Sequence, residues 1–253
     1  MERKIMPGQD LVMVGEVGTY ARDRLLELRY DRIRERFSRV YLNEELNKIK
    51  SQNEVMDEWY NSAREARAAQ SEFDPIEVVM PGYQKEYGVT KICKVEKGGV
   101  LKALWDFCES ESIDSETGKR RGEGAGCEFR YDRIPISQFT MELCEVFDLF
   151  PYRLWSEKCF IMSMDKGAHF CEDFLRIQLE MSKKLADETF AKGGRTGFDS
   201  EQHVRTTEPE KAAVFGRFIK GKKRIRTDGT ETGYLTKESY EELERFLNGE
   251  KRM

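Results

Sequence analysis

The segment 90–107, TKICKVEKGGVLKALWDF, constrains the fold of this chain more than any other stretch. β-Prone residues precede a glycine pair, Gly98 and Gly99, and apolar residues at helical spacing follow it. The β-prone residues are Val89, Ile92 and Val95, and the helical ones are Val100, Leu101, Leu104, Trp105 and Phe107. The segment therefore predicts a strand, a tight glycine turn and a helix in immediate succession.

The glycine pair also indicates a candidate binding site. Glycine permits a tight turn, so the unpaired N–H groups of the first helical turn can face a phosphate or carboxylate. The candidate residues for a phosphorylated ligand are Lys94, Lys97, Gly98 and Gly99, with a contribution from Arg133. Two alternatives stay open, since glycine pairs often only reverse the chain and the lysines can be solvent-exposed charge. The pattern identifies no catalytic residue.

Charge and hydropathy exclude some classes of partner. The chain has 253 residues, enough to bury a substantial core, with 39% hydrophobic and 36% charged residues and a net charge of -4. This balance gives no overall basic field for nucleic acid or an anionic membrane. No apolar run approaches the roughly 18 residues that cross a bilayer, and the first residues lack a signal-peptide core. We therefore expect a cytoplasmic protein with no nucleic-acid and no membrane partner.

The cysteines and histidines do not predict a metal site. The six cysteines form no CxxC motif and are expected to be reduced, several of them buried as small hydrophobes. Of the two histidines, His169 lies two residues from Cys171, so both could face one side of a strand. Two ligands do not make a zinc site, and no metal is expected.

Periodicity predicts an alternation of strands and helices along the chain. The first strand spans 7–14, and helices follow over 19–52, either as one helix or as two joined near Leu42 and Asn43, and then over 54–71. Ser137 is predicted to cap a helix over 138–147. The remaining predicted elements are strands at 127–131 and 159–164, helical turns at 152–155, a helix at 171–190, a strand pair at 212–219 and 223–227 around Gly221, and a helix at 237–247 capped by Thr236.

This order of elements predicts an α/β (α+β) fold, a mixed β-sheet flanked by helices. We expect a single domain over 1–253, with a helical insertion at 19–72 after the first strand. The Gly-rich, charged segments 114–126 and 192–211 are expected to be loops, the second of them mobile.

Four motifs in collinear order resemble the C-terminal domain of the aminoimidazole ribonucleotide (AIR) synthetase superfamily. They are PGQDLVMVGEVGTYA, VEKGGVLKALWDFCESESI, FRYDRIPISQFTMELCEVFDLFPYRLWSEKCFIMSM and AAVFGRFIKGKKRIRTDG. The chain is most similar to the AIR synthase-related proteins near the hydrogenase-maturation carbamoyl dehydratase, with selenophosphate synthetase and thiamine-monophosphate kinase as more distant members. The resemblance implies a PurM C-terminal-domain-like fold.

The resemblance also implies what the chain lacks. Family members carry most ATP and magnesium ligands in an N-terminal domain that these motifs do not include. In the family's D-x-T-x-GG turn, Lys94 stands at the position of the Asp and Glu96 at that of the Thr, which reverses the local charge. No cofactor is therefore expected, and ATP with magnesium would enter only if a partner supplies the missing domain.

Two functions follow as hypotheses. The first is a protein that is non-catalytic by itself and binds a phosphorylated ligand or a protein partner, as a homodimer or with a companion protein that carries the N-terminal domain. The alternative is an ATP-dependent enzyme of the purine-biosynthesis or hydrogenase-maturation type, acting with a partner chain. Phosphoryl transfer depends on positioned metal carboxylates, and the sequence shows no such constellation.

Overall fold

A computed structural model describes residues 4–65, 82–112, 122, 124–191, 211–237 and 242–249. These residues form one seven-stranded mixed sheet in the order β2-β4-β1-β5-β3-β6-β7. Its strands are β1 (Asp10–Val14), β2 (Lys91–Lys94), β3 (Gly126–Arg130), β4 (Phe160–Met164), β5 (Ala212–Ile219), β6 (Arg224–Asp228) and β7 (Glu231–Tyr234). Neighbouring strands are antiparallel except β3 and β6, which are parallel.

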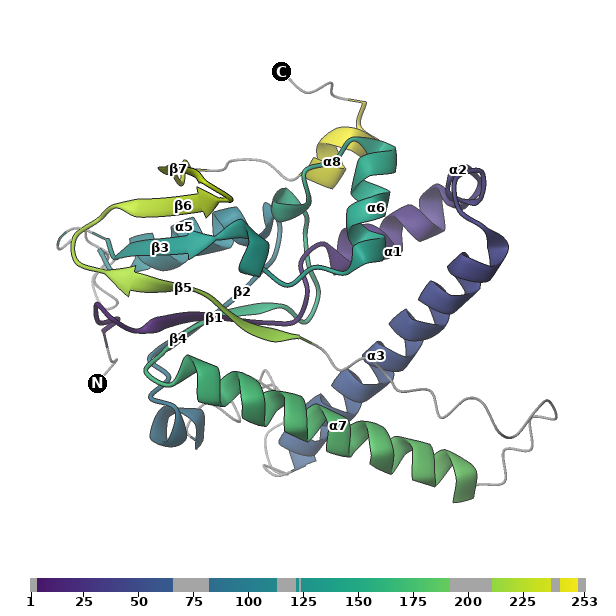
Figure 1. Ribbon diagram of the computed structural model, residues 1–253, viewed down its shortest axis with the longest axis horizontal. Coiled ribbons are helices and arrows are strands. Elements are labelled where there is room, and N and C mark those ends of the chain that lie inside the picture. Colours follow the sequence, from purple (N-terminus) through teal and green to yellow (C-terminus); the bar gives the residue numbers. More distant parts are fainter. Residues whose placement is uncertain are drawn as a thin grey trace.

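Helices cover both faces of this sheet and one of its ends (Figure 1). The helix α5 packs on one face and α7 on the other, α1, α2, α6 and α8 gather at the end, and α3 runs from this end to α7 and packs against it (Figure 1). Their bounds are α1 (Thr19–Leu28), α2 (Tyr30–Arg34), α3 (Arg39–Glu65), α5 (Gly99–Ser110), α6 (Gln138–Phe147), α7 (Gly167–Ala191) and α8 (Glu242–Leu247), with 3-10 turns η1 (Tyr131–Arg133) and η2 (Pro151–Arg153). The α/β class and the mixed sheet flanked by helices are thus confirmed.

β1 lies inside the sheet and is buried on both faces. Leu11 and Met13 join the hydrophobic core under α5, whereas Val12 and Val14 join the core under α7. Successive side chains of a strand point to opposite faces, so a strand between two helical layers needs a continuous apolar run. The same rule explains β4, whose five residues are all buried.

A third core cluster joins the helical insertion to α6 and α8. Leu25 of α1, Ile33 of α2 and Leu42 of α3 are nearly inaccessible to solvent and pack with Phe139 of α6. The helices inserted after β1 are thus part of the folded domain. The part of the predicted insertion beyond residue 65 lies outside the described residues.

The helix predicted over 19–52, as one helix or as two joined near Leu42 and Asn43, is divided at other positions, and it is not separate from the helix predicted over 54–71, because α3 spans Arg39–Glu65. The chain leaves helical geometry at Arg29 and again over 35–38, and α3 runs without interruption through Leu42. The cap of α3 is Ser38, whose Oγ accepts a hydrogen bond from the Tyr41 N–H at 3.2 Å. Leu42 lies in the first turn of this helix and is buried in the third cluster.

The predicted pairing of strands 212–219 and 223–227 is also wrong. Both strands exist as β5 and β6, but β3 lies between them, with Cys127 paired to Phe218 on one side and to Arg224 on the other. The turn at Gly221 therefore crosses the end of β3 instead of closing a hairpin. The hairpin forms one step later, between β6 and β7 around Gly229, whose φ is 57°.

The remaining elements follow the prediction with shifted ends. Ser137 caps α6, since its Oγ accepts a hydrogen bond from the Thr140 N–H at 3.2 Å. α7 begins at Gly167, before the predicted start at 171, and α8 is described only over Glu242–Leu247. Most of the predicted loop 114–126 and all but the last residue of 192–211 lie outside the described residues.

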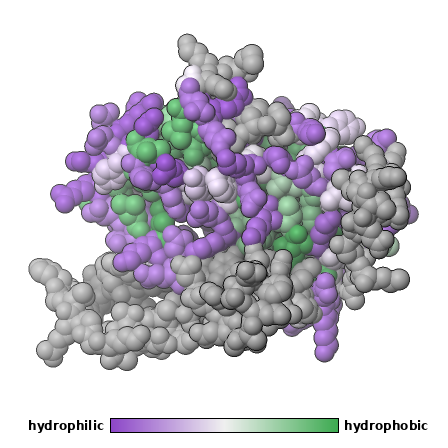
Figure 2. Space-filling view, turned by 180° about the vertical axis from the view of Figure 1, so that it is seen from behind, coloured by the Kyte–Doolittle hydropathy of each residue, from purple (hydrophilic) through white to green (hydrophobic). Residues whose placement is uncertain are grey.

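The surface of the described part is mainly polar. Figure 2 shows hydrophilic side chains over most of the described surface on one side, interrupted by separate apolar patches. Most of the exposed large apolar residues belong to different elements, and only Leu175 and Leu179 share one, α7: Met6, Leu28, Tyr30, Val40, Leu175, Leu179 and Tyr234. None of the helices in the described ranges is both long and apolar enough to span a bilayer.

Substitution of Leu11 by Ala tests the role of β1. We expect Leu11→Ala to lower the free energy of unfolding by about 2–5 kcal/mol, because it leaves a cavity beneath α5. The matched control is Leu175→Ala on α7, where the side chain is 45% exposed and the expected change is within about 0.5 kcal/mol. Urea unfolding monitored by circular dichroism measures both, and equal losses would contradict the central role of β1.

Candidate functional site

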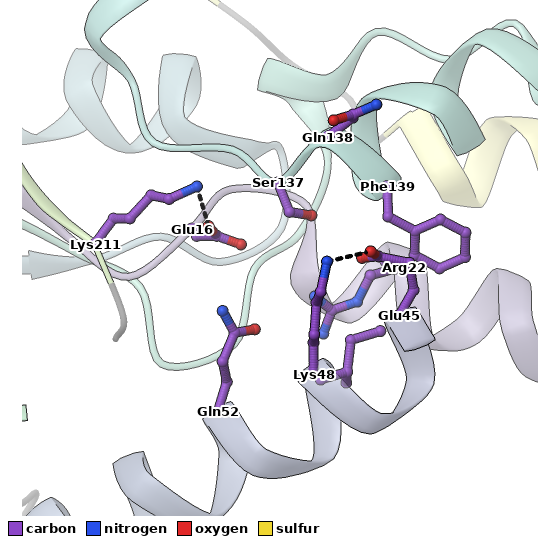
Figure 3. Close-up of a pocket in the computed structure, with 10 residues that line it drawn as sticks. Glu16, Arg22, Glu45, Lys48, Gln52, Ser137, Gln138, Phe139 and Lys211 are labelled. Atoms are coloured by element: carbon purple, nitrogen blue, oxygen red, sulfur yellow. Dashed lines mark hydrogen bonds and ion pairs between the residues drawn. The ribbon is translucent and has the colours of Figure 1, made fainter. Parts of the chain in front are cut away.

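A cleft of about 220 Å³ opens where the turn after β1, the helix α3 and the first turn of α6 meet (Figure 3). Charged and polar side chains dominate its walls. The lining residues are Glu16, Arg22, Glu45, Lys48, Ile49, Gln52, Ser137, Gln138, Phe139 and Lys211. They come from four segments that are far apart in the sequence.

The turn after β1 forms the floor of the cleft. Gly15 and Gly18 have φ values of 84° and 76°, which glycine adopts at little cost. The Gly18 N–H donates to Ser156 Oγ at 2.7 Å, which fixes the start of α1. The turn thereby buries Glu16, whose Oε1 lies 3.0 Å from Lys211 Nζ (Figure 3).

Arg22 is the most deeply buried cation of the site. Its side chain is only 4% exposed, and its Nε donates to Asp23 Oδ1 at 2.7 Å. A buried guanidinium is retained where carboxylates or other anions compensate its lost hydration. On the facing wall, Lys48 Nζ lies 2.7 Å from Glu45 Oε1 on α3 (Figure 3).

The first turn of α6 adds a helix N-terminus to this wall. Ser137, Gln138 and Phe139 line the cleft, and the N-terminal end of a helix carries partial positive charge. The ionisable lining residues are three cations (Arg22, Lys48 and Lys211) and two carboxylates (Glu16 and Glu45), and Asp23, which pairs with Arg22, brings the formal charge to zero. The features that favour an anionic group are therefore the positive end of α6 and the half-exposed lysines.

The predicted glycine turn forms as expected, but other parts of the chain occupy its surroundings. Gly98 and Gly99 have φ values of 90° and 70° and start α5. The Gly99 N–H donates to the Glu96 carbonyl at 2.9 Å, and a Cβ on Gly99 would lie 2.7 Å from Arg153 Cα. The close approach of η2 thus accounts for Gly99 without a ligand, and binding at this turn stays a prediction.

The structure does not gather all five predicted residues. Lys97 pairs with Glu244 of α8 at 2.5 Å, and its Nζ lies 5.7 Å from the centre of the Trp155 ring. Lys94 is exposed at the end of β2, an edge strand. Arg133 is exposed on η1, whose Tyr131 stacks on Tyr152 of η2. None of the five belongs to the residues that line the cleft described above.

One sequence signal pointed towards the cleft. The motif Gly15-Glu-Val-Gly18 directly after a strand is a second strand–glycine–helix turn, at the floor of the cleft. Arg22, Lys48 and Lys211 carry no comparable signal, because a charged residue on an amphipathic helix or before a strand is ordinarily solvated.

His169 and Cys171 do not share a strand. Both lie on α7, where residues two positions apart point in different directions, and His169 Nδ1 lies 3.2 Å from Asp173 Oδ2. Within the described ranges, no three side chains of His, Cys, Asp or Glu gather closely enough to hold a metal ion. The expectation of no metal and no cofactor remains a prediction.

Comparisons with known proteins place the fold. No family model matches the chain, and no curated protein matches its sequence. E. coli HypE, a hydrogenase maturation protein, is similar in structure with a TM-score of 0.51 at 14% identity, over 97% of this chain and 54% of that one. A HypE structure in complex with ATP gives a TM-score of 0.50 at 11% identity, over 96% and 54%.

Thiamine-monophosphate kinase from Stenotrophomonas maltophilia K279a also matches, at 11% identity over 92% of this chain and 53% of that one, but its TM-score of 0.40 is too low to support an argument. The chain spans about half the length of these structures. The resemblance to AIR synthase-related proteins is therefore confirmed at the level of the fold. Its correspondence to the C-terminal domain alone remains a prediction.

The packing of η2 against the glycine turn predicts unequal effects of two substitutions. We expect Gly99→Ala to lower the free energy of unfolding by about 3 kcal/mol, because it adds a clash to a strained φ. Gly221→Ala is the matched control, since its φ is 85° but no atom lies within 4 Å of the new Cβ. Its expected cost is about 1 kcal/mol, from backbone strain alone. Similar losses in chemical denaturation would show that η2 does not constrain Gly99.

Proposed function

We propose that this chain is a binding module of AIR synthase-like fold that holds a small phosphorylated ligand in the cleft between α3 and α6. The observation that carries the proposal is the buried Arg22 in a cleft that Lys48 and Lys211 also line. Phosphate groups are bound by arginine and lysine through charge-assisted hydrogen bonds.

The ion pairs of the cleft support an anion as the ligand. Lys48 and Lys211 are 48% and 46% exposed, so they can turn towards a ligand while their partners Glu45 and Glu16 stay 12% and 5% exposed. A phosphate would add to the compensation that Asp23 already gives the Arg22 guanidinium, and it would lie near the positive end of α6. ATP is bound in one structure of HypE, and we therefore choose ATP as a probe for this chain.

We further propose that the chain by itself does not catalyse phosphoryl transfer. The two carboxylates of the cleft pair with lysines, whereas phosphoryl transfer requires carboxylates that hold metal ions. Lys94, which stands at the position of the family's Asp, also supports the proposal that the chain by itself is not catalytic. The alternative is an ATP-dependent enzyme assembled with a companion chain or a second copy. This alternative is favoured by the length of the chain, which covers about half of the HypE chain.

Titration calorimetry with the purified chain tests the cleft. The probes are inorganic phosphate, ATP with and without Mg²⁺, and aminoimidazole ribonucleotide. We expect one of them to bind, and Lys48→Gln or Lys211→Gln to raise its Kd about tenfold, the loss of one charge-assisted hydrogen bond. The control is Lys102→Gln on α5, where the lysine is 42% exposed and also paired within its own helix, to Asp106.

Binding that survives both cleft variants would overturn this assignment. Lys97→Glu then tests the rival position at the glycine turn. If the cleft is the site, Lys97→Glu leaves the Kd unchanged and lowers stability by about 1 kcal/mol or less, because the Lys97–Glu244 pair is exposed. If Lys97→Glu abolishes binding while the fold persists, the ligand binds beside Lys94, Lys97, Gly98 and Gly99.

A further inference from the structure

Two cysteines far from the cleft lie in direct contact. Cys108 near the end of α5 and Cys127 on β3 are both 0% exposed, and their Sγ atoms are 3.7 Å apart. A disulfide requires about 2.05 Å between the sulfurs, so they need to approach by about 1.7 Å. The backbone already ties the two elements, since the Ala125 N–H donates to the Cys108 carbonyl at 2.9 Å.

A buried guanidinium lies beside this thiol pair. Arg224 on β6 is paired with Cys127 in the β3–β6 ladder and is 5% exposed. Its Nη2 donates to Glu109 Oε1 at 2.7 Å, and its guanidinium carbon lies 4.0 Å from the centre of the Trp105 ring. The Arg224 Nε is buried without a hydrogen-bond partner in the part of the chain that the structure describes. An unsatisfied buried N–H of a cation favours an anion next to it.

The electrostatics make the two sulfurs unequal. The hydrogen bond between the two thiols lowers the pKa of the Cys108 thiol, burial opposes this shift, and the charge of Arg224 lowers the pKa further. The hydrogen bond to Cys108 and burial raise the pKa of the Cys127 thiol well above its ordinary value. By contrast, burial raises the pKa of the half-buried Cys93 and Cys171 to about 11. Since the thiolate is the reactive form, Cys108 is distinguished from these three cysteines.

We propose that Cys108 and Cys127 form an oxidant-modification site, at which hydrogen peroxide produces an intramolecular disulfide. The Cys108 thiolate attacks a peroxide oxygen, the O–O bond breaks, and a sulfenic acid and hydroxide form. The Cys127 sulfur then attacks the Cys108 sulfur, loses its proton, and displaces the hydroxyl group as water. The two thiols are oxidised together, and one hydrogen peroxide is reduced to two water molecules.

The disulfide would join α5 to β3 and close a loop between residues that are 19 positions apart. Cross-linking restricts the unfolded chain, so the oxidised protein is expected to melt at a higher temperature than the reduced protein. This inference is independent of the ligand proposed for the cleft.

The test exposes the full chain to hydrogen peroxide, denatures it, alkylates the remaining thiols and maps the peptides by mass spectrometry. We expect the alkylated peptides of Cys108 and Cys127 to disappear together and one peptide that links the two cysteines to appear. A Cys93→Ser/Cys171→Ser variant is expected to give the same cross-linked peptide. If both thiols remain free for alkylation under conditions that oxidise Cys93 or Cys171, the proposal is wrong.

Two variants separate the proposed roles. In Cys127→Ser the reaction is expected to stop at a sulfenic acid on Cys108, which dimedone traps, and trapping at another cysteine instead would overturn the order of events. Arg224→Gln is expected to slow disulfide formation about tenfold, because the guanidinium no longer favours the Cys108 thiolate. An unchanged rate in a folded Arg224→Gln protein would contradict the role of the guanidinium.

Discussion

The burial of β1 on both faces is the constraint on which the rest of the structure depends. Leu11 and Met13 face one helical layer and Val12 and Val14 the other, so the strand stays inside the sheet between β4 and β5. The position of Val14, the last residue of β1, is therefore also fixed within the fold. The chain leaves the sheet through a glycine turn, and that turn carries Glu16 into the cleft and starts the helix that carries Arg22.

The helical insertion gives this turn its opposing wall. α3 lies across the start of α6 because Leu42 and Phe139 share a core cluster, and this packing places Lys48 over the same cleft as Lys211. Residues of four separate segments of this chain thus line one charged cleft. The thiol pair shows a similar principle at another place, since α5, β3 and β6 bring Cys108, Cys127 and Arg224 together.

Local patterns predicted the elements well where short-range physics decides them. Ser137 was expected to cap α6 because its hydroxyl can satisfy an N–H of the first helical turn, and it does. The apolar run of β4 and the glycine start of α5 are local in the same sense. The partner of β6 is not local, since a turn at Gly221 is compatible both with a hairpin and with a crossing over β3. Hydrogen bonds to β3, whose residues lie 97 positions before their partners in β6, decide between them.

The sequence by itself determined the class of fold, the alternation of strands and helices, and the two strand–glycine–helix turns, because hydrophobic periodicity and glycine conformation act over a few residues. Only the tertiary structure decided which of these turns opens into a cleft. Backbone from a distant segment packs closely against both turns, η2 against Gly99 and Lys158 against Gly15, but only the second turn carries a side chain, Glu16, into a cleft that α3 and α6 also line. Both outcomes depend on packing between segments distant in sequence, and no pattern along the chain encodes such distances.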